Sequence, residues 1–440
     1  MTSIMLIFLL LCFSKGVSGL DYLPKLILAP TKAYPGYPSN EDWGYSQVSP
    51  GGYYFWWLYK SKEQSAPLII WLSGGPVVAS TAIANFDEIG PYDVQFKKRP
   101  NTWLKYADLL FVDNYLGAGF SYSKTSSFET SANQVANYLI VWMKDFLKRH
   151  PQYEKRKVFL FGESIGGLIA VKFARLMTTK NLPLSGVCLL SPDISIPDTV
   201  ANTAEYLYTA SLIDGVERDA ITNASALTVA VAQSGVPIQS SPEYMKEHEL
   251  QNTATNGTNY FNIEYTQNFQ AKRKASMTLI GSNAYPTVEI QPTFQTLYAT
   301  LMNGPVKKYL SKKVKIPTKF APKAKVAVKA FDSGESYNGV DDVDFLLTSG
   351  VNVSMLTSQF DARANTPGQL SWIKTLTWPA LPLWITSKRQ GFDGVKGNMK
   401  AFRKQYDNFA FYTVLRSGHL IPMDQPAVAL KIMRQVISRR

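Results

Sequence analysis

The feature that most restricts the fold of this chain is a serine set between a short apolar run and a helix-like stretch. Residues 158–161 form an apolar run typical of a buried strand, and Gly162-Glu163-Ser164-Ile165-Gly166 follows directly. Residues 167–177 then have the pattern of a helix. Glycines flank a serine in this way where a strand turns sharply into a helix, because larger side chains do not fit there. The pattern predicts that the Ser164 hydroxyl is exposed at the carboxyl edge of a sheet.

Short apolar runs elsewhere predict that this sheet is mostly parallel. They alternate with stretches of helical spacing, as expected when helices cover both faces of a parallel sheet. From about residue 197 to residue 322 the composition becomes polar and these runs stop, so we interpret the segment as an inserted cap, or lid, over the sheet. The predicted strands are 68–72, 109–112, 158–161, 186–190, 351–356 and 409–415, and the predicted helices are 131–149, 167–177 and 427–439.

Residues 1–19 are predicted to be a signal peptide, which leaves residues 20–440 as the α/β domain. An apolar run at 4–13 precedes small residues ending at Gly19, and it is shorter than the roughly twenty apolar residues that span a bilayer. No later stretch is long and apolar enough to cross a membrane, so we expect no stable membrane insertion. Three glycosylation sequons fit a secreted or lysosomal protein, and they lie at Asn223, Asn256 and Asn352.

The composition predicts a folded chain and limits its partners. A chain of 440 residues with 45% hydrophobic content can bury a large core. Cys12 falls in the predicted signal peptide, which leaves Cys188 alone and excludes an intrachain disulfide. The net charge is +13, and lysines cluster from Lys307 to Lys329. Because aromatic and Arg residues are not interleaved with them, we expect no nucleic-acid partner and interpret this lysine cluster as a solvated face, with a weak anionic contact left open.

A nucleophilic serine needs a general base, and the chain has 3 histidines. In α/β-hydrolases the nucleophile comes first in the sequence, then the acid, then the histidine. His150 precedes Ser164 and is interpreted as a surface residue. His248 lies in the polar insertion, where a solvated helix is the simplest interpretation. His419 follows a late predicted strand and is therefore the predicted base.

The acid has to lie between Ser164 and His419 in the sequence. Asp361 does so, and it follows the predicted strand 351–356 and its short extension. A carboxylate at this position would accept the ring N–H of His419 and fix its tautomer. It would also stabilise the imidazolium that forms when Ser164 loses its proton. We therefore predict a triad of these three residues.

Six further sequence patterns lie in a fixed order along the chain. They are Trp71-Leu72-Ser73-Gly74-Gly75-Pro76, Phe86-Asp87-Glu88-Ile89-Gly90-Pro91, Leu110-Phe111-Val112-Asp113 with Gly119-Phe120-Ser121-Tyr122, Gly162-Glu163-Ser164, Gln359-Phe360-Asp361 and Gly418-His419-Leu420-Ile421-Pro422-Met423-Asp424-Gln425-Pro426. Together they resemble the signature of the serine carboxypeptidase family over essentially the whole mature chain. Residues 54–58 and 301–305 are most similar to its retinoid-inducible branch. The resemblance implies an α/β-hydrolase fold, with a mostly parallel central sheet, helices on both faces and a cap.

The resemblance also implies an activity, that of a serine-type carboxypeptidase. Such an enzyme releases C-terminal residues from peptides through an acyl-enzyme on its serine, here Ser164, and we expect it to work at acidic pH. Its partners would be the C-termini of peptides or proteins, and no cofactor or metal is implied. The backbone N–H groups of Gly75 and Ile165 would form the oxyanion hole, which binds the charge that develops on the substrate carbonyl.

A second set of implied residues would bind the terminal carboxylate of the substrate. Glu163 would do so with Glu88 and Ser73 beside it, and binding one carboxylate with two others requires protonated carboxyl groups. The chain departs from the family pattern here, because Ser73 replaces the usual Asn or Gln and reaches less far. It also has Val77-Val78 where glycine and small residues are usual, and β-branched residues avoid positive φ.

These departures leave two other functions open. One is a catalytically impaired homologue that acts as a secreted or lysosomal binding or stabilising protein. The other is an esterase or acyltransferase that uses the same triad. The sequence also leaves open whether the chain forms a homodimer.

Overall fold

The structure is a computed structural model. It describes residues 33–37, 40–75, 78–238, 241–265, 292–322, 324–332, 334, 337–393 and 398–439. The predicted signal peptide at 1–19 and Val77 lie outside these residues. Within the described chain, no helix has the length and apolar character needed to span a bilayer.

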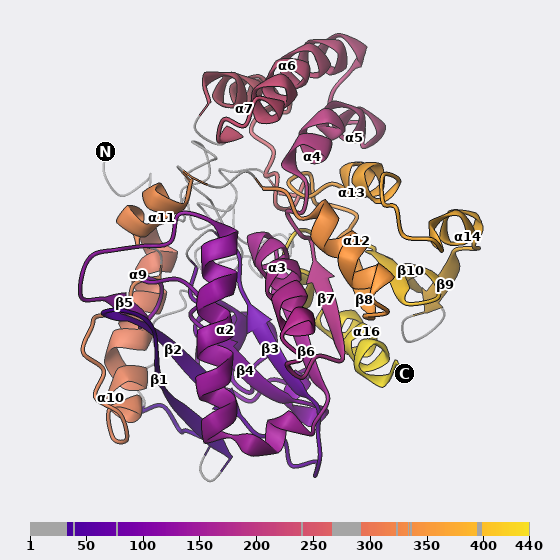
Figure 1. The fold of residues 1–440 in the computed structure, drawn as a ribbon. Helices are drawn as coiled ribbons and strands as arrows, with labels where there is room; N and C mark the ends of the chain where they lie inside the picture. Colours follow the sequence, from indigo (N-terminus) through magenta and orange to yellow (C-terminus); the bar gives the residue numbers. More distant parts are fainter. Residues whose placement is uncertain are drawn as a thin grey trace, which may run out of the picture.

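A single large sheet forms the centre of the described structure (Figure 1). Its strand order is β1-β2-β4-β3-β6-β7-β8-β11-β10-β9, and β5 pairs with β2 beside this path. The six strands from β4 to β11 in this order run parallel, and the strands at both edges run antiparallel. The strands are β1 Glu41–Ser49, β2 Gly52–Tyr59, β3 Leu68–Leu72, β4 Asp108–Val112, β5 Tyr122–Ser123, β6 Val158–Glu163, β7 Gly186–Leu190, β8 Val353–Ser358, β9 Gln390–Asp393, β10 Met399–Tyr406 and β11 Phe409–Val414.

The central strands are buried on both faces, which explains their continuous apolar sequences. Every residue of β3, β4, β6, β7 and β8 is buried. Helices cover a strand on both sides only in a layered α/β arrangement, where alternation of polar and apolar residues disappears. The predicted mostly parallel sheet with helices is confirmed.

Four helices flank this sheet. Helices α2 (Ala132–Arg149), α3 (Ile165–Thr179) and α12 (Val340–Thr348) lie on the face turned toward the viewer in Figure 1, and α16 (Pro426–Ser438) lies on the other. Helix α2 begins after Ser131, whose side chain accepts a hydrogen bond from the Gln134 backbone N–H. A serine at this position satisfies one of the free N–H groups at a helix start.

The segment predicted as a cap is distributed over two places. Helices α4 (Ile196–Ala201), α5 (Thr203–Thr209), α6 (Gly215–Gln233) and α7 (Pro242–Ala254) stand together above the sheet in Figure 1. The part of the predicted cap segment from residue 292 to residue 322 instead lies beside β1 and β2. There the Trp43 indole N–H donates to the Leu310 carbonyl at 2.9 Å. The bounds 197–322 of a cap domain therefore stay a prediction, and we call only α4 to α7 the cap helices.

The remaining helical segments are short. They include 3₁₀-helical and π-helical segments as well as short α-helices. They are η2 Ala84–Glu88, η3 Trp103–Lys105, η4 Pro151–Glu154, α9 Pro292–Leu301, η6 Met302–Val306, α10 Lys307–Leu310, α11 Lys325–Asp332, α13 Thr366–Ile373, α14 Leu381–Thr386 and α15 Ile421–Asp424.

Candidate active site

Ser164 occupies a strained turn between β6 and α3. Its backbone has φ 56° and ψ −127°, a conformation that residues other than glycine rarely adopt. The two flanking glycines have no room for a side chain. A Cβ on Gly162 would come within 2.3 Å of the Gly166 carbonyl oxygen, and one on Gly166 within 2.1 Å of the Leu72 oxygen. The turn thus depends on both glycines, and strain of this kind is found at sites where it holds a functional group in place.

His419 and Asp361 lie together at the ends of two adjacent strands. Asp361 follows β8 and His419 follows β11, and these strands pair in parallel. His419 Nδ1 lies 2.8 Å from Asp361 Oδ2, and both side chains are fully buried. The other Asp361 oxygen accepts the Ala364 backbone N–H at 2.9 Å. The carboxylate therefore fixes the ring with its proton on Nδ1, which leaves Nε2 as the basic nitrogen.

The remaining ring nitrogen of His419 is free to act. No described residue forms a hydrogen bond with His419 Nε2. The ring is held from the cap side by Phe261, whose ring packs edge-to-face at 5.1 Å and whose carbonyl accepts the His419 backbone N–H at 2.7 Å. A buried, oriented imidazole with one open nitrogen has the arrangement of a general base.

The Ser164 hydroxyl has a different partner in this structure. It donates to Asp193 Oδ2 at 3.2 Å, and Asp193 follows β7, the strand next to β6. Arg363 Nη2 donates to the same oxygen at 3.1 Å. Neither residue was predicted from the sequence, because the one signal, the position of Asp193 after a buried strand, is shared by any aspartate in a turn.

Gly75 and Ile165 lie on the two chain segments that meet at Ser164. Gly75 has φ 124°, which favours glycine, and a Cβ on neighbouring Gly74 would come within 2.6 Å of the Ser164 Cβ and 3.0 Å of the Ile165 nitrogen. Ile165 is the first residue of α3, so its N–H has no acceptor within the helix. The structure therefore brings both predicted oxyanion-hole segments against the serine.

A buried carboxylate anchors the loop that carries Gly75. Asp113, at the end of β4, accepts the backbone N–H groups of Thr81 and Phe120, each at 3.1 Å, and the Thr81 hydroxyl. Burial raises the pKa of Asp113 to about 7. The residue ties the segment after β3 to the segment after β4, which keeps the glycine loop next to the nucleophile.

Glu163 and Glu88 form a buried pair of carboxyl groups next to the nucleophile. Both are fully buried, and no other described residue forms a hydrogen bond with any of their four carboxyl oxygens. Burial raises the pKa of Glu88 to about 8. Burial and the proximity of Glu88 hold the pKa of Glu163 well above its usual range. We call these two residues the acid pair, and they carry protons at neutral pH.

Two neighbours of the acid pair complete this part of the site. Asp424 on α15 accepts the Gly418 backbone N–H at 2.7 Å, and burial raises its pKa to about 6. The Ser73 hydroxyl accepts the indole N–H of Trp71 at 3.1 Å. Ser73 is buried, and its role in carboxylate binding stays a prediction.

The other two histidines are not where the sequence analysis placed them. His150 was interpreted as a surface residue, but it is 7% exposed and packs against Phe146 with ring centroids 4.7 Å apart. His248 was interpreted as part of a solvated helix, but it is 5% exposed, and burial lowers its pKa to about 3. Both interpretations were wrong, because each turn or helix folds its histidine inward against aromatic residues.

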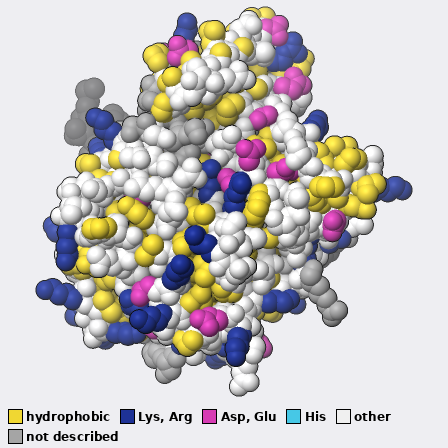
Figure 2. Space-filling view, viewed as in Figure 1, with side chains coloured by type: hydrophobic (Ala, Val, Ile, Leu, Met, Phe, Trp, Pro, Cys, Tyr) yellow, Lys and Arg dark blue, Asp and Glu magenta, His cyan; other side chains and the backbone are white. Residues whose placement is uncertain are grey.

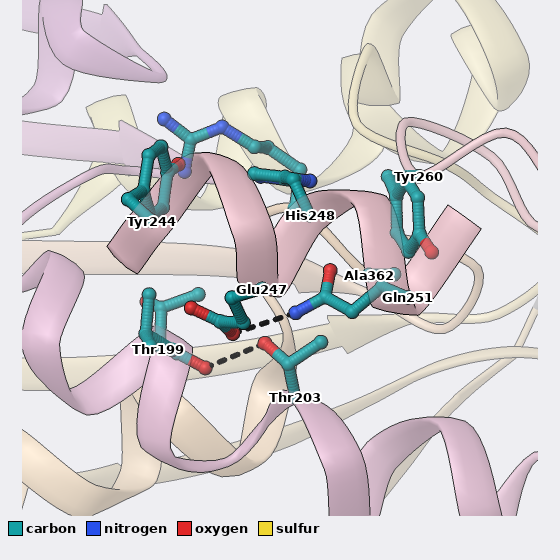
Figure 3. A pocket seen from close by; sticks show the side chains of 10 residues that line it. Thr199, Thr203, Tyr244, Glu247, His248, Gln251, Tyr260 and Ala362 are labelled. Atoms are coloured by element: carbon teal, nitrogen blue, oxygen red, sulfur yellow. Dashed lines mark hydrogen bonds between the residues drawn. The ribbon is translucent and has the colours of Figure 1, made fainter. Parts of the chain in front are cut away.

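His248 lines a small cavity among the cap helices (Figure 3). The cavity measures about 20 Å³, enough for one water molecule. Figure 3 shows Gln251 hydrogen-bonded to Glu247, and Thr203 to Thr199. Glu247 is fully buried, and burial raises its pKa to about 7. Arg363 also lines this cavity, so it lies between the cap helices and Asp193.

The predicted glycosylation sequons differ in exposure. Asn223 on α6 and Asn256 after α7 are exposed, whereas Asn352 before β8 is half-buried. In the glycine loop, Val78 is buried, and a Cβ on Gly75 would come within 2.5 Å of it. The valine therefore packs against the loop that carries Gly75.

Comparison with known proteins identifies the family. The family model for serine carboxypeptidases matches residues 30–439. The retinoid-inducible serine carboxypeptidase of Mus musculus is 32% identical over 413 residues, with 90% of this chain and 91% of that protein covered. The human protein of the same name is 31% identical over 422 residues, with 92% of each covered. The chain belongs to the serine carboxypeptidase family.

A solved structure supports the fold. The crystal structure of Kex1(delta)p, a prohormone-processing carboxypeptidase from Saccharomyces cerevisiae, matches with a TM-score of 0.70 at 19% identity, covering 90% of both chains. The α/β-hydrolase fold predicted from the sequence is confirmed. These relatives do not favour either alternative function, the impaired homologue or the esterase.

Proposed function

We propose that this protein is a serine carboxypeptidase that removes the last residue of peptides through an acyl-enzyme on Ser164. The observation that carries the proposal is the acid pair, because its two protonated carboxyl groups lie beside the nucleophile in a site that contains a buried His419–Asp361 couple. A site built in this way accepts a substrate whose scissile bond is one residue away from a free carboxylate.

The triad would carry out acyl transfer in two stages. His419 Nε2 takes the proton of the Ser164 hydroxyl as its oxygen attacks the last peptide carbonyl. The same nitrogen then gives the proton to the leaving amine, and the terminal amino acid departs. Water, deprotonated by His419, next attacks the ester on Ser164, and the shortened peptide leaves with a new carboxyl group. Asp361 holds the ring and stabilises its charged form throughout.

The oxyanion hole would bind the charge that develops on the carbonyl oxygen. The proposed donors are the backbone N–H groups of Gly75 and Ile165, which lie on the two segments packed against Ser164. The start of α3 adds the favourable end of its dipole. Donors aimed at a developing charge typically contribute a factor of about 10² to 10³ in rate.

The acid pair would recognise the terminal carboxylate as a hydrogen-bond donor. A protonated carboxyl group donates to a carboxylate, whereas an ionised one repels it. Because the pKa of Glu88 is raised to about 8, the donor form is present at acidic and neutral pH and is lost as the pH rises through about 8. This recognition suits the acidic working pH expected from the sequence.

The direct test is the release of the terminal amino acid from an N-blocked dipeptide by the purified protein and by Ser164→Ala. We expect the variant to lose activity by a factor of about 10⁴ or more, because the nucleophile acts together with its base. A Cys188→Ala variant is the matched control, since that thiol is buried in β7 and takes no part in the mechanism. Equal activity of Ser164→Ala and the unaltered protein would contradict the proposal.

Export and glycosylation complete the proposal. We infer that residues 1–19 direct the chain into the secretory route, so that it reaches a lysosome or the outside of the cell, and that exposed Asn223 and Asn256 carry glycans. An acidic compartment would keep the acid pair protonated. Treatment of the mature protein with an N-glycosidase, followed by mass spectrometry, would locate the mature N-terminus and the modified asparagines.

An anionic contact through the lysine cluster has less support. Lys313 pairs with Asp42, and Lys307 donates to the Thr318 carbonyl at 2.6 Å, so part of the cluster has partners within the chain. On the face shown in Figure 2, Lys and Arg side chains are dispersed among uncharged ones. A weak contact with anionic polymers stays a proposal, and salt-dependent retention on immobilised heparin would test it. Dimer formation is a separate question, which sedimentation would answer.

A further inference from the structure

The strongest unassigned feature is the charged pair beside the nucleophile. Asp193 and Arg363 are 1% and 4% exposed at their side chains, and they form an ion pair at 3.1 Å. Burying two charges is costly and stabilises a fold little, so a buried ion pair calls for another explanation. This pair is placed where it can act on the serine, because Asp193 Oδ2 accepts the Ser164 hydroxyl at 3.2 Å.

The hydrogen bond to Asp193 competes with the bond that catalysis needs. Attack requires the Ser164 proton to point at His419 Nε2, yet in this structure that nitrogen has no partner among the described residues. A carboxylate is a stronger acceptor than a neutral imidazole, because hydrogen bonds to charged groups are roughly twice as strong as neutral ones. In the resting enzyme the Ser164 hydroxyl is therefore bonded to Asp193, which is not the group that takes its proton in the reaction.

Arg363 is fixed from two directions, which holds the acceptor Asp193 in place beside Ser164. It lies two residues after Asp361, so the loop that orients the base also carries the cation. It also lines the cap cavity with His248 and Glu247. Burial raises the pKa of Asp193, and Arg363 acts against this by favouring the ionised carboxylate.

We propose that Asp193 is a positioning residue that holds the Ser164 hydroxyl away from His419 in the resting enzyme, and that Arg363 maintains Asp193 in this role. Substrate binding then has to transfer the hydroxyl from Asp193 to His419 before attack. This inference rests on the proposed function for its physiological meaning. The hydrogen-bond exchange itself concerns only Ser164 and its neighbours.

The test is the rate at which a fluorophosphonate labels Ser164, because labelling requires the hydroxyl on His419 but no peptide. The double variant Asp193→Asn/Arg363→Gln removes both charges with little change of size. We expect labelling to become faster by about tenfold, the ratio that separates a charge-assisted from a neutral hydrogen bond. The kcat for peptide release should rise by up to the same factor, with KM little changed.

Two comparisons separate this effect from a general loss of structure. Lys172→Gln/Asp342→Asn removes another ion pair, joined at 3.1 Å between α3 and α12 and mostly buried, and should leave the labelling rate unchanged. Arg363→Lys retains the positive charge and should keep the slow labelling of the unaltered protein. If the double variant does not fold, Asp193→Asn alone tests the same exchange, since its amide oxygen still accepts from Arg363.

An unchanged or slower labelling rate in the folded Asp193 variants would overturn the inference, because Asp193 would then be neutral or helpful to attack. Faster labelling without peptide release would leave the inference standing and would instead contradict the carboxypeptidase activity. The two results are therefore distinguishable in one set of samples.

Discussion

Two buried acidic sites lie beside Ser164, and they differ in the position of the nearest cation. Arg363 contacts the Asp193 carboxylate directly, at 3.1 Å. The cation near the acid pair is Arg99, and it donates to the backbone carbonyls of Asp87 and Glu88, at 2.7 and 2.8 Å, and not to a carboxyl group. Burial raises the pKa at both sites, but only Asp193 has a guanidinium in direct contact with its carboxyl group. We therefore expect the guanidinium to keep Asp193 a hydrogen-bond acceptor, whereas the acid pair, where each carboxyl group also opposes the ionisation of the other, has protons to donate.

The largest expected effect comes from removing the cation. Arg363→Met leaves Asp193 buried without its partner, which should lower the free energy of unfolding by about 3–5 kcal/mol. Glu88→Gln should change it by about 1 kcal/mol or less, because a neutral amide replaces a neutral acid. Urea denaturation followed by fluorescence measures both.

A suitable control is Arg175→Met, because Arg175 is the exposed partner of Asp342 in another ion pair. Its loss should cost less than about 1 kcal/mol. If Arg363→Met and Glu88→Gln had equal effects on unfolding, the two acidic sites would not differ in charge, and the comparison would fail.

The next effect concerns pH. Since the pKa of Glu88 is raised to about 8, the acid pair donates below that pH and loses its proton above it. The KM for peptides with a free C-terminal carboxylate should therefore rise as the pH passes about 8, by up to about tenfold per pH unit. In Glu88→Gln, whose amide donates at any pH, this rise should be smaller. Initial-rate kinetics between pH 5 and pH 9 measure both, and a KM that falls with pH would contradict the assignment.

The smallest expected effect is at Ser73. Its hydroxyl accepts the Trp71 indole N–H and is short, so it contributes little to binding a carboxylate. Ser73→Asn places an N–H donor farther into the site and should lower the KM for free-acid peptides by about threefold, the value of a weak hydrogen bond. The KM for a C-terminally amidated peptide is the internal control and should not change. An increase in KM for the free acid would show that the hydroxyl already serves the substrate.

Much of the fold could be predicted because the central strands are buried on both faces. The strand β3 has the predicted bounds, and β6 extends two residues beyond them. The antiparallel edge strands β1, β2, β9 and β10 were not predicted. Strands β1 and β10 are partly exposed and mix polar and apolar residues, whereas β2 is an almost wholly buried aromatic run whose residues were used only for the family resemblance. Cap helix α7 was taken for a solvated helix, because its inward face, with Glu247 and His248, is polar rather than apolar.

The candidate site was predictable where each residue follows a strand. Ser164, Asp361 and His419 all do so, and their order along the chain assigned their roles. Asp193 was not predictable in this way, because an aspartate after a strand resembles any turn residue. Its importance depends on Arg363, which lies 170 residues away in the sequence and meets it only in the folded chain.

The central claim is that the acid pair directs Ser164 to the end of a peptide. It is tested most directly by the ratio of kcat/KM for a peptide with a free terminal carboxylate to that for its amide, measured at pH 6 in the unaltered protein and in Glu163→Leu. We predict a ratio of at least about 100 in the unaltered protein, the value of one or two charge-assisted hydrogen bonds, and a ratio near one in the variant. Fluorophosphonate labelling shows whether Ser164 remains active in both. An unchanged ratio in a variant that still labels would contradict the account.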